Sequence, residues 1–355
     1  MEVVTADGVT GLGETYGDTK YLELARPLAD RLTGRQITDV NALFGLDIAV
    51  DPARVDSSVD VGGLRGVLSA DKLRLSVLSA FEVACLDALG KALGLPVHAL
   101  LGGKVRDSVE YSAYLFYKWA GHPKGVAGEK DDWGAALDPA GVVEQARRFK
   151  ERHGFTSFKL KGGVFPPEQE IAAVRAWPTP SPDTRCAWTQ RRLVGGDLAA
   201  RGGRTRRPPR VPGGPRPRHA RHGRGGRPHR RAAGDQHVRD DLRRDRGGLH
   251  QGAVQVVLSD HHYWGGLRNT QRLAAICHAF GVGVSMHSNT HLGISLAAMT
   301  HVAATVADLD HACDSHYPWQ SEDVLAERLT FTGGRIAVSD APGLGVELDR
   351  DELAR

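Results

Sequence analysis

The chain has few cysteines and no long apolar run, and both shortages exclude whole classes of protein. The cysteines are Cys85, Cys186, Cys277 and Cys313. No two of them form a CxxC pair, so neither a disulfide framework nor a zinc–thiolate site is expected. No apolar stretch is long enough to cross a bilayer, and the first residues lack the basic and then apolar pattern of a secretory leader. We therefore expect a cytoplasmic protein with no membrane partner.

Lysine is absent from more than half of the chain, because none occurs after Lys161. Arginine is distributed just as unevenly, since 19 of the 36 arginines lie between residues 178 and 250. The formal net charge of +4 therefore comes from that segment, and the rest of the chain is acidic. With 355 residues, 41% of them hydrophobic, the chain can form two domains or one large barrel with an accessory domain.

Residues 1–105 are expected to form an α+β domain. Residues 3–14 alternate in polarity around Asp7-Gly8, which is a hairpin turn signal. Residues 73–95 carry apolar side chains at helical spacing and end at Gly94-Leu95-Pro96. Because the first predicted strand already begins at residue 2, we expect this domain to be truncated at its start.

Residues 106–335 alternate predicted strands with predicted helices. The strands are expected near 109–116, 157–161, 254–260 and 282–287, and the helices near 139–153, 167–177, 267–280 and 294–304. Repeated strand-then-helix units predict a parallel sheet covered by helices. In a (β/α) barrel the functional side chains follow the strands at their carboxyl ends. Residues 336–355 are expected to return to the amino-terminal domain.

Two lysines end the predicted strand 157–161. Lys159 and Lys161 are two residues apart, so both point to the same face of a strand. A lysine is a general base when a neighbouring positive charge lowers its pKa, and the second lysine supplies such a charge. The competing interpretation is a solvated pair at a strand end, and the pattern alone leaves both open.

A carboxylate and an imidazole end the next two predicted strands. Asp260 follows residues 254–259, and His287 opens the polar stretch Ser285–His291. A neighbouring carboxylate orients an imidazole and raises its basicity, although such pairs are more often structural than catalytic. His316 follows a further strand. A lysine on one side and a His–Asp pair on the other suit proton transfer at opposite faces of a carbon acid.

These motifs together resemble the glucarate dehydratase branch of the enolase superfamily. The resemblance covers about residues 1–177 and 251–355. It rests on Tyr114–Tyr117, Lys159-Leu160-Lys161, Leu258-Ser259-Asp260, Ser285–Ala297, Asp314-Ser315-His316 and Pro342–Glu347. The lack of lysine after Lys161 argues against the muconate-lactonising branch, which uses a lysine on a later strand.

The resemblance implies a (β/α)7β barrel of the TIM type with an amino-terminal α+β capping domain. It implies Mg²⁺-assisted loss of water from an aldarate, a small-molecule acid sugar, by proton abstraction next to a carboxylate. By this resemblance Lys161 and His287 abstract the proton, each from its own face. Lys159 lowers the pKa of Lys161, and Asp260 orients His287. Substrate-binding residues would be Asn289, His316, Tyr114 and Phe116. The resemblance also suggests a homo-oligomer.

Residues 178–250 depart from this pattern. The branch needs three oxygen ligands for Mg²⁺ at the ends of three strands that should lie here. The segment is rich in Arg, Gly and Pro and shows no strand-like apolar run, so the sequence identifies no metal ligand. We expect a chain that turns over poorly or not at all, and that is unstable because sheet edges lie open.

Three explanations of this segment compete. Back-translated and shifted by one base, parts of it permit sequences that resemble the three ligand strands of the branch, which favours compensating frameshifts. Taken at face value, its Arg-Gly repeats would bind nucleic acid through phosphate charge. Its only aromatic residue is Trp188, however, and base stacking needs more, so a nucleic-acid partner is not expected. The third is a folded, catalytically inactive remnant.

Overall fold

The computed structural model describes residues 1–46, 50, 69–121, 131–176, 255–288 and 291–354, together with the backbone of Arg185–Gln190. Most of the segment 178–250, with the carboxylates that the sequence offers there, therefore lies outside the described residues. Asn289 also lies outside them.

The amino-terminal domain is a hairpin packed on a long buried helix. Strands β1 (Glu2–Val4) and β2 (Thr10–Leu12) pair antiparallel, and Gly8 takes a φ of 82° in the turn between them. The other elements are α1 (Thr19–Leu32), the 3-10 helix η1 (Val40–Gly45), α2 (Ala70–Leu93) and α3 (Val97–Leu100). Helix α2 begins at Ser69, whose side chain accepts a hydrogen bond from the Lys72 amide, and ends at left-handed Gly94.

The parallel strands lie in two groups. In the first, the order is β5 (Arg185–Gln190), β4 (Ser157–Lys161), β3 (Ser108–Phe116) and β8 (Cys313–Ser315), and β9 (Arg335–Ala337) pairs antiparallel with β3. In the second, β6 (Val256–Ser259) pairs with β7 (Gly283–Met286). The register of β3 on β4 sets Tyr114 opposite Lys159 and Phe116 opposite Lys161.

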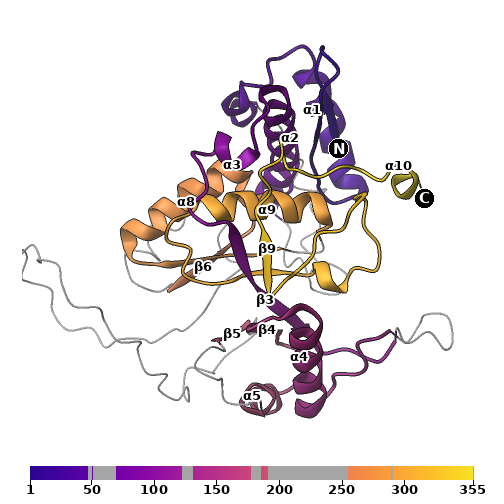
Figure 1. Ribbon diagram of the computed structural model, residues 1–355, viewed down its shortest axis with the longest axis vertical. Coiled ribbons are helices and arrows are strands. Elements are labelled where there is room, and N and C mark those ends of the chain that lie inside the picture. The colour runs from indigo at the N-terminus through magenta and orange to yellow at the C-terminus, as the bar shows by residue number, and fades with distance from the viewer. Residues whose placement is uncertain are drawn as a thin grey trace, which may run out of the picture.

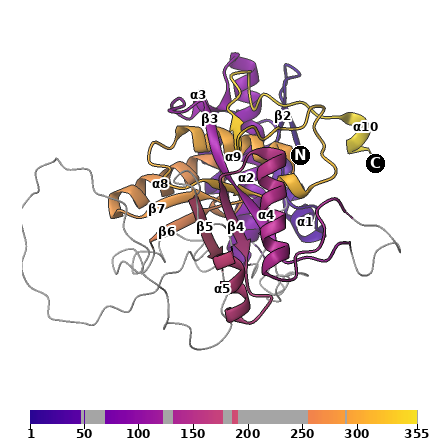
Figure 2. The ribbon, with the colours of Figure 1, turned by 60° about the horizontal axis from the view of Figure 1, so that its bottom comes forward.

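Hydrogen bonds join the two groups between β7 and β8. The Ser285 hydroxyl donates to the Ala312 carbonyl at 2.8 Å, and the Ser288 amide donates to the Asp314 carbonyl at 3.2 Å. The described strands therefore follow one another in the order β5, β4, β3, β8, β7, β6, and because the paired strands run parallel their carboxyl ends lie at one edge. Figure 2 shows β4 beside β5 and β6 beside β7.

Five helices of the described chain pack around these strands and against the amino-terminal domain. They are α4 (Pro139–His153), α5 (Pro167–Ala176), α7 (His261–Trp264), α8 (Leu267–Phe280) and α9 (Gly293–Thr305). Helix α9 is buried along almost its whole length and lies below α2 (Figure 1). Among the described helices, none has both the length and the hydropathy of a membrane span.

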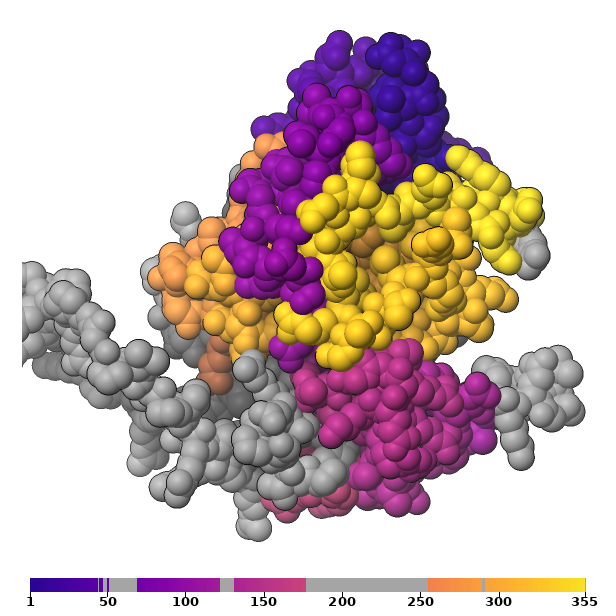
Figure 3. Space-filling model, in the orientation of Figure 1, coloured from indigo at the N-terminus to yellow at the C-terminus, as the bar shows by residue number. Residues whose placement is uncertain are grey.

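The carboxyl-terminal segment returns to the amino-terminal domain. The Leu344 amide donates to Asp87 of α2 at 2.7 Å, and Arg350, in α10 (Arg350–Leu353), pairs with Glu2 of β1 at 2.6 Å. Figure 3 shows this segment, in yellow, covering part of one face between the purple and magenta parts of the chain.

The predicted α/β class and the predicted order of strands and helices are confirmed. One expectation was wrong: β5 is a strand inside the segment for which the sequence predicted none, and it pairs in parallel with β4. Its six residues contain neither proline nor glycine and include Cys186, Trp188 and Thr189, so nothing in their composition opposes an extended backbone.

Candidate functional site

The two lysines of β4 lie side by side at the carboxyl end of the strand. Lys159 is buried and Lys161, the last residue, is partly exposed. Their ammonium groups lie 4.4 Å and 5.9 Å from the centre of the Tyr114 ring on the neighbouring strand. The strand alternation that the sequence indicated thus directs both charges to the same side of the sheet.

Lys159 belongs to a buried trio with Asp314 and His287. Its ammonium Nζ lies 2.7 Å from Asp314 Oδ2, and the other oxygen, Oδ1, lies 2.5 Å from His287 Nδ1. All three side chains are almost fully buried. Although burial alone would favour the neutral acid, His287 and Lys159 hold the pKa of Asp314 well below its usual range. Asp314 is therefore an anion that fixes both partners.

This arrangement sets the protonation state of His287. Burial lowers the pKa of the His287 imidazole, and the Asp314 carboxylate opposes that effect only in part. The neutral ring donates Nδ1–H to Asp314, which leaves the lone pair on Nε2. This Nε2 atom is buried and has no hydrogen-bond partner in the described part of the chain. His287 is thus oriented as a base.

Lys161 is a second candidate base. Burial, and then the positive charge of Lys159, lower the pKa of the Lys161 ammonium to about 8, against a smaller opposing effect of Asp314. A substantial fraction of Lys161 is therefore neutral near pH 8. Its pKa lies close to the operating range at which a general base works best.

Aromatic residues surround these bases. The ring of His316 lies 4.5 Å from that of Tyr114 and 5.1 Å from that of Phe116, measured between centroids. Within the described residues, His316 Nε2 and the Tyr114 hydroxyl are buried without hydrogen-bond partners. Because buried polar groups are normally paired, these atoms are suited to contact a polar molecule. The structure therefore brings together the predicted residues Lys159, Lys161, His287, His316, Tyr114 and Phe116.

The sequence predicted that Asp260 orients His287, but in the structure the Asp260 carboxylate contacts His262. Its Oδ1 accepts hydrogen bonds from the His262 amide and lies 3.0 Å from His262 Nδ1, so the carboxylate caps α7. The carboxylate bonded to His287 is instead Asp314, because the hydrogen bonds between β7 and β8 set these two residues beside each other. The sequence contained a signal that Asp314 lies in the site. Asp314 and His316 are two residues apart after the apolar Cys313, and this alternation is expected at a strand end.

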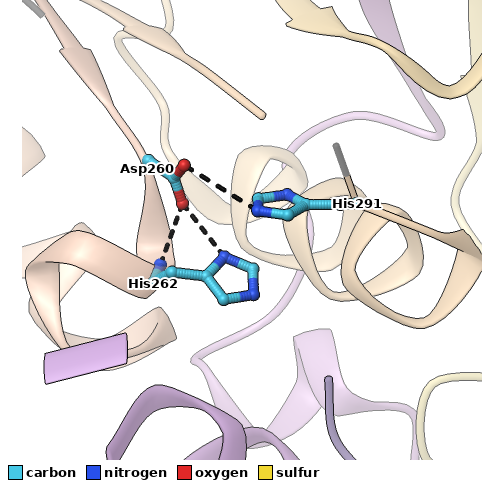
Figure 4. Close-up of side chains that lie close together, drawn as sticks. All are labelled: Asp260, His262 and His291. Carbon is cyan, nitrogen blue, oxygen red and sulfur yellow. Dashed lines mark hydrogen bonds and ion pairs between the residues drawn. The ribbon is translucent and has the colours of Figure 1, made fainter. Parts of the chain in front are cut away.

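Asp260 also belongs to a cluster with two histidines, His262 and His291, whose proximity the sequence did not predict. Figure 4 shows the Asp260 carboxylate in contact with both His262 and His291, and Asp260 Oδ2 lies 3.9 Å from His291 Nε2. Within the described residues this is the one group of three with metal-ligand side chains in close range. Two imidazoles and one carboxylate do not fit Mg²⁺, which takes oxygen ligands. The strands that the resemblance predicts for those oxygens fall in 178–250.

The geometry suits chemistry at a carbon acid. It provides a neutral imidazole oriented by a carboxylate, a lysine with lowered pKa, and the Lys159 cation held between them. Such a set can remove a proton next to a carboxylate and return one to a leaving oxygen.

Comparisons with known proteins agree with the fold. Residues 1–102 match the family model described as mandelate racemase / muconate lactonizing enzyme, N-terminal domain. Residues 233–352 match the model described as enolase C-terminal domain-like. A probable glucarate dehydratase from Streptomyces coelicolor is 67% identical over 362 aligned positions, which cover 100% of this chain and 83% of the relative.

Two solved enolase structures also resemble this chain over almost its whole length. An enolase from Mycobacterium smegmatis, complexed with formate and acetate, is 40% identical with a TM-score of 0.79 and covers 99% of this chain and 82% of its own. An enolase from Thermobispora bispora, complexed with magnesium and formate, is 40% identical with a TM-score of 0.77 and covers 99% and 84%.

Proposed function

We propose, from the premise that the chain belongs to the glucarate dehydratase branch of the enolase superfamily, that it acts on aldarates through Lys161 and His287. Membership gives the chain the (β/α) barrel with an amino-terminal cap and makes it a hydro-lyase with a small-molecule substrate. The aldarate, the roles of the individual residues and the metal requirement are the proposal.

The Asp314–His287 hydrogen bond at 2.5 Å is the observation that carries the proposal. It leaves His287 Nε2 as a base without a partner among the described side chains. In the proposed reaction, Lys161 or His287 removes the proton next to a carboxylate. The electron pair left on carbon expels the neighbouring hydroxyl group. When His287 is the base, the hydroxyl takes that same proton back from the His287 imidazolium and leaves as water. When Lys161 is the base, a His287 ring that has bound a proton on Nε2 beforehand supplies the proton.

The remaining residues hold the substrate and the charge. Lys159 lowers the pKa of Lys161 and attracts the substrate carboxylate, while its bond to Asp314 keeps it in place. We assign substrate contacts to His316, Tyr114 and Phe116, and to Asn289, which lies outside the described residues. The unpartnered His316 Nε2 and Tyr114 hydroxyl support this assignment.

Magnesium is proposed from the relatives, since the Thermobispora bispora structure holds it. When bound, Mg²⁺ stabilises the negative charge that develops on the substrate carboxylate, an effect of several kcal/mol. The Asp260 cluster does not fit it, and the sequence of residues 178–250 identifies no metal ligand. We therefore propose that this chain turns over at least about 10³-fold more slowly than an ordinary enzyme at ~10 s⁻¹.

The roles of the two bases are tested in a chimera in which residues 178–250 are replaced by the corresponding segment of the Streptomyces coelicolor relative. Exchange of the proton next to the carboxylate is followed by NMR in D₂O with glucarate and with its epimer at the reacting carbon. Lys161→Met should abolish exchange of one epimer and His287→Asn that of the other. If each variant still exchanges both epimers at the parent rate, the assignment of the two bases is wrong.

A further inference from the structure

Three buried side chains from separate elements converge beside the proposed active site. Asp260 follows β6, His262 lies in the first turn of α7, and His291 precedes α9. Each is at most 3% exposed. The start of α9 rests on Glu14 of the amino-terminal domain, whose carboxylate accepts the Leu292 and Ser295 amides, and His262 of α7 lies 3.2 Å from the Glu14 carbonyl. The cluster is therefore built into the junction of the two domains.

The distances within the cluster suit a small cation. Asp260 Oδ1 lies 3.0 Å from His262 Nδ1, Asp260 Oδ2 lies 3.9 Å from His291 Nε2, and one ligand atom from each residue lies within 4.8 Å of the others. Ligands bound tetrahedrally at ~2.1 Å from a metal are about 3.4 Å apart. Only small side-chain movements separate the present arrangement from that geometry.

The cluster also contains polar atoms that lack partners. Asp260 Oδ2 and both ring nitrogens of His291 have no hydrogen-bond partner in the described part of the chain, although they are fully buried. Buried polar groups are normally paired, and leaving them unpaired destabilises the fold. A cation between them would satisfy the carboxylate oxygen and one imidazole nitrogen at once.

The surroundings of His262 match those of a metal-bound imidazole. Its Nε2 lies 3.2 Å from the Glu14 carbonyl oxygen, which can only accept, and 3.1 Å from the Ser295 hydroxyl. When Nε2–H is donated to the carbonyl, Nδ1 directs its lone pair towards Asp260. Ligating histidines characteristically donate their other ring N–H to a backbone carbonyl.

We propose that Asp260, His262 and His291 form a site for a divalent transition metal of the Zn²⁺ type, separate from any magnesium site. Imidazole nitrogen together with one carboxylate favours Zn²⁺, Co²⁺ or Ni²⁺ over Mg²⁺. Three protein ligands leave a further coordination position for water.

The test is a Co²⁺ titration of the purified, chelator-treated full chain in excess Mg²⁺, read by visible absorption, with Zn²⁺ added in competition. One equivalent should bind with the absorption bands of a site of low coordination number, and Zn²⁺ should displace it and raise the Tm. If the chain binds no Co²⁺ or Zn²⁺ in the presence of Mg²⁺, the proposal is overturned, whatever the variants show.

Matched variants locate the site. His262→Gln and His291→Gln should each weaken Co²⁺ binding at least tenfold, whereas His261→Gln, a buried neighbour outside the cluster, should not. The double variant His219→Gln/His222→Gln, which removes two histidines of the 178–250 segment, should bind Co²⁺ with the affinity of the parent chain. Unchanged affinity in both cluster variants, or an equal loss in His261→Gln, would show that the metal binds elsewhere.

Discussion

The carboxylate of Asp314 bridges the His287 imidazole and the Lys159 ammonium, at 2.5 Å and 2.7 Å. The contact follows from the pairing of neighbouring strands, because the Ser288 amide on β7's end donates to the Asp314 carbonyl on β8. One buried anion thus fixes a base and a cation from two other strands.

Asp314→Asn should lower the free energy of unfolding by about 3–5 kcal/mol, since it leaves the buried Lys159 charge without its partner. Asp340→Asn is the matched control, because Asp340 also pairs with one lysine and one histidine, Lys104 and His98, but is mostly exposed. Urea unfolding measures both, and the control should change little. Equal losses of unfolding free energy in the two variants would mean that the buried trio of Lys159, Asp314 and His287 stabilises the fold no more than the exposed Asp340 pairs do.

Lys161→Met should stabilise the protein at pH 7. The folded pKa of about 8 lies below the ordinary value of 10.5, so the unfolded chain binds more protons between these values and wild-type stability rises with pH there. The gain of the variant is up to about 3 kcal/mol below pH 8 and shrinks towards pH 10. Lys104→Met is the control. Because the hydrogen bond to Asp340 raises the pKa of Lys104, the change in unfolding free energy should have the opposite sign in this variant. A pH-independent difference for Lys161→Met contradicts this account.

Glu82→Gln should stabilise the protein above pH 7 and have little effect near pH 4.5. The Glu82 carboxyl of α2 is buried, which raises its pKa to about 7 although it accepts the Leu267 amide at the start of α8. Wild-type stability is therefore full below pH 4.5 and is lost as pH rises through 7. The expected gain at pH 8 is up to about 3 kcal/mol, measured by urea unfolding at both pH values. A larger gain at pH 4.5 than at pH 8 would refute the assignment.

Gly11→Ala should destabilise the amino-terminal domain by about 1–3 kcal/mol or more. A Cβ at this position would lie 2.0 Å from the Ala84 carbonyl oxygen of α2, so β2 and the helix would have to separate. Gly17→Ala is the matched control, since a Cβ there meets nothing within 4 Å. Thermal unfolding distinguishes the two, and a Tm of Gly11→Ala equal to that of Gly17→Ala would show that the close packing tolerates a methyl group.

Much of the fold could be predicted because its elements are marked locally. Helix α4 begins with Asp138 before Pro139 and ends at left-handed Gly154, and the predicted and observed limits coincide. Short elements with weak signals, such as β5 and α7, were not predicted. Periodicity carries little information over four to six residues.

The candidate site could be predicted less completely than the fold. Strand alternation placed Lys159 and Lys161 together, and the order of motifs identified His287 and His316. The choice between Asp260 and Asp314 as the partner of His287 depends on which strand ends are in register across a nonlocal contact. That information is absent from the spacing along the chain. The cluster of His262 and His291 around Asp260 depends on nonlocal packing in the same way.

The most direct test of the account compares glucarate dehydration by the 355-residue chain and by the chimera that carries the Streptomyces coelicolor segment, with Mg²⁺ present. We expect ordinary turnover, ~10 s⁻¹, in the chimera and a rate at least about 10³-fold lower in the chain itself. Ordinary turnover by the 355-residue chain would contradict the proposed impairment. A chimera that folds but does not dehydrate glucarate would contradict the proposed roles of Lys161 and His287.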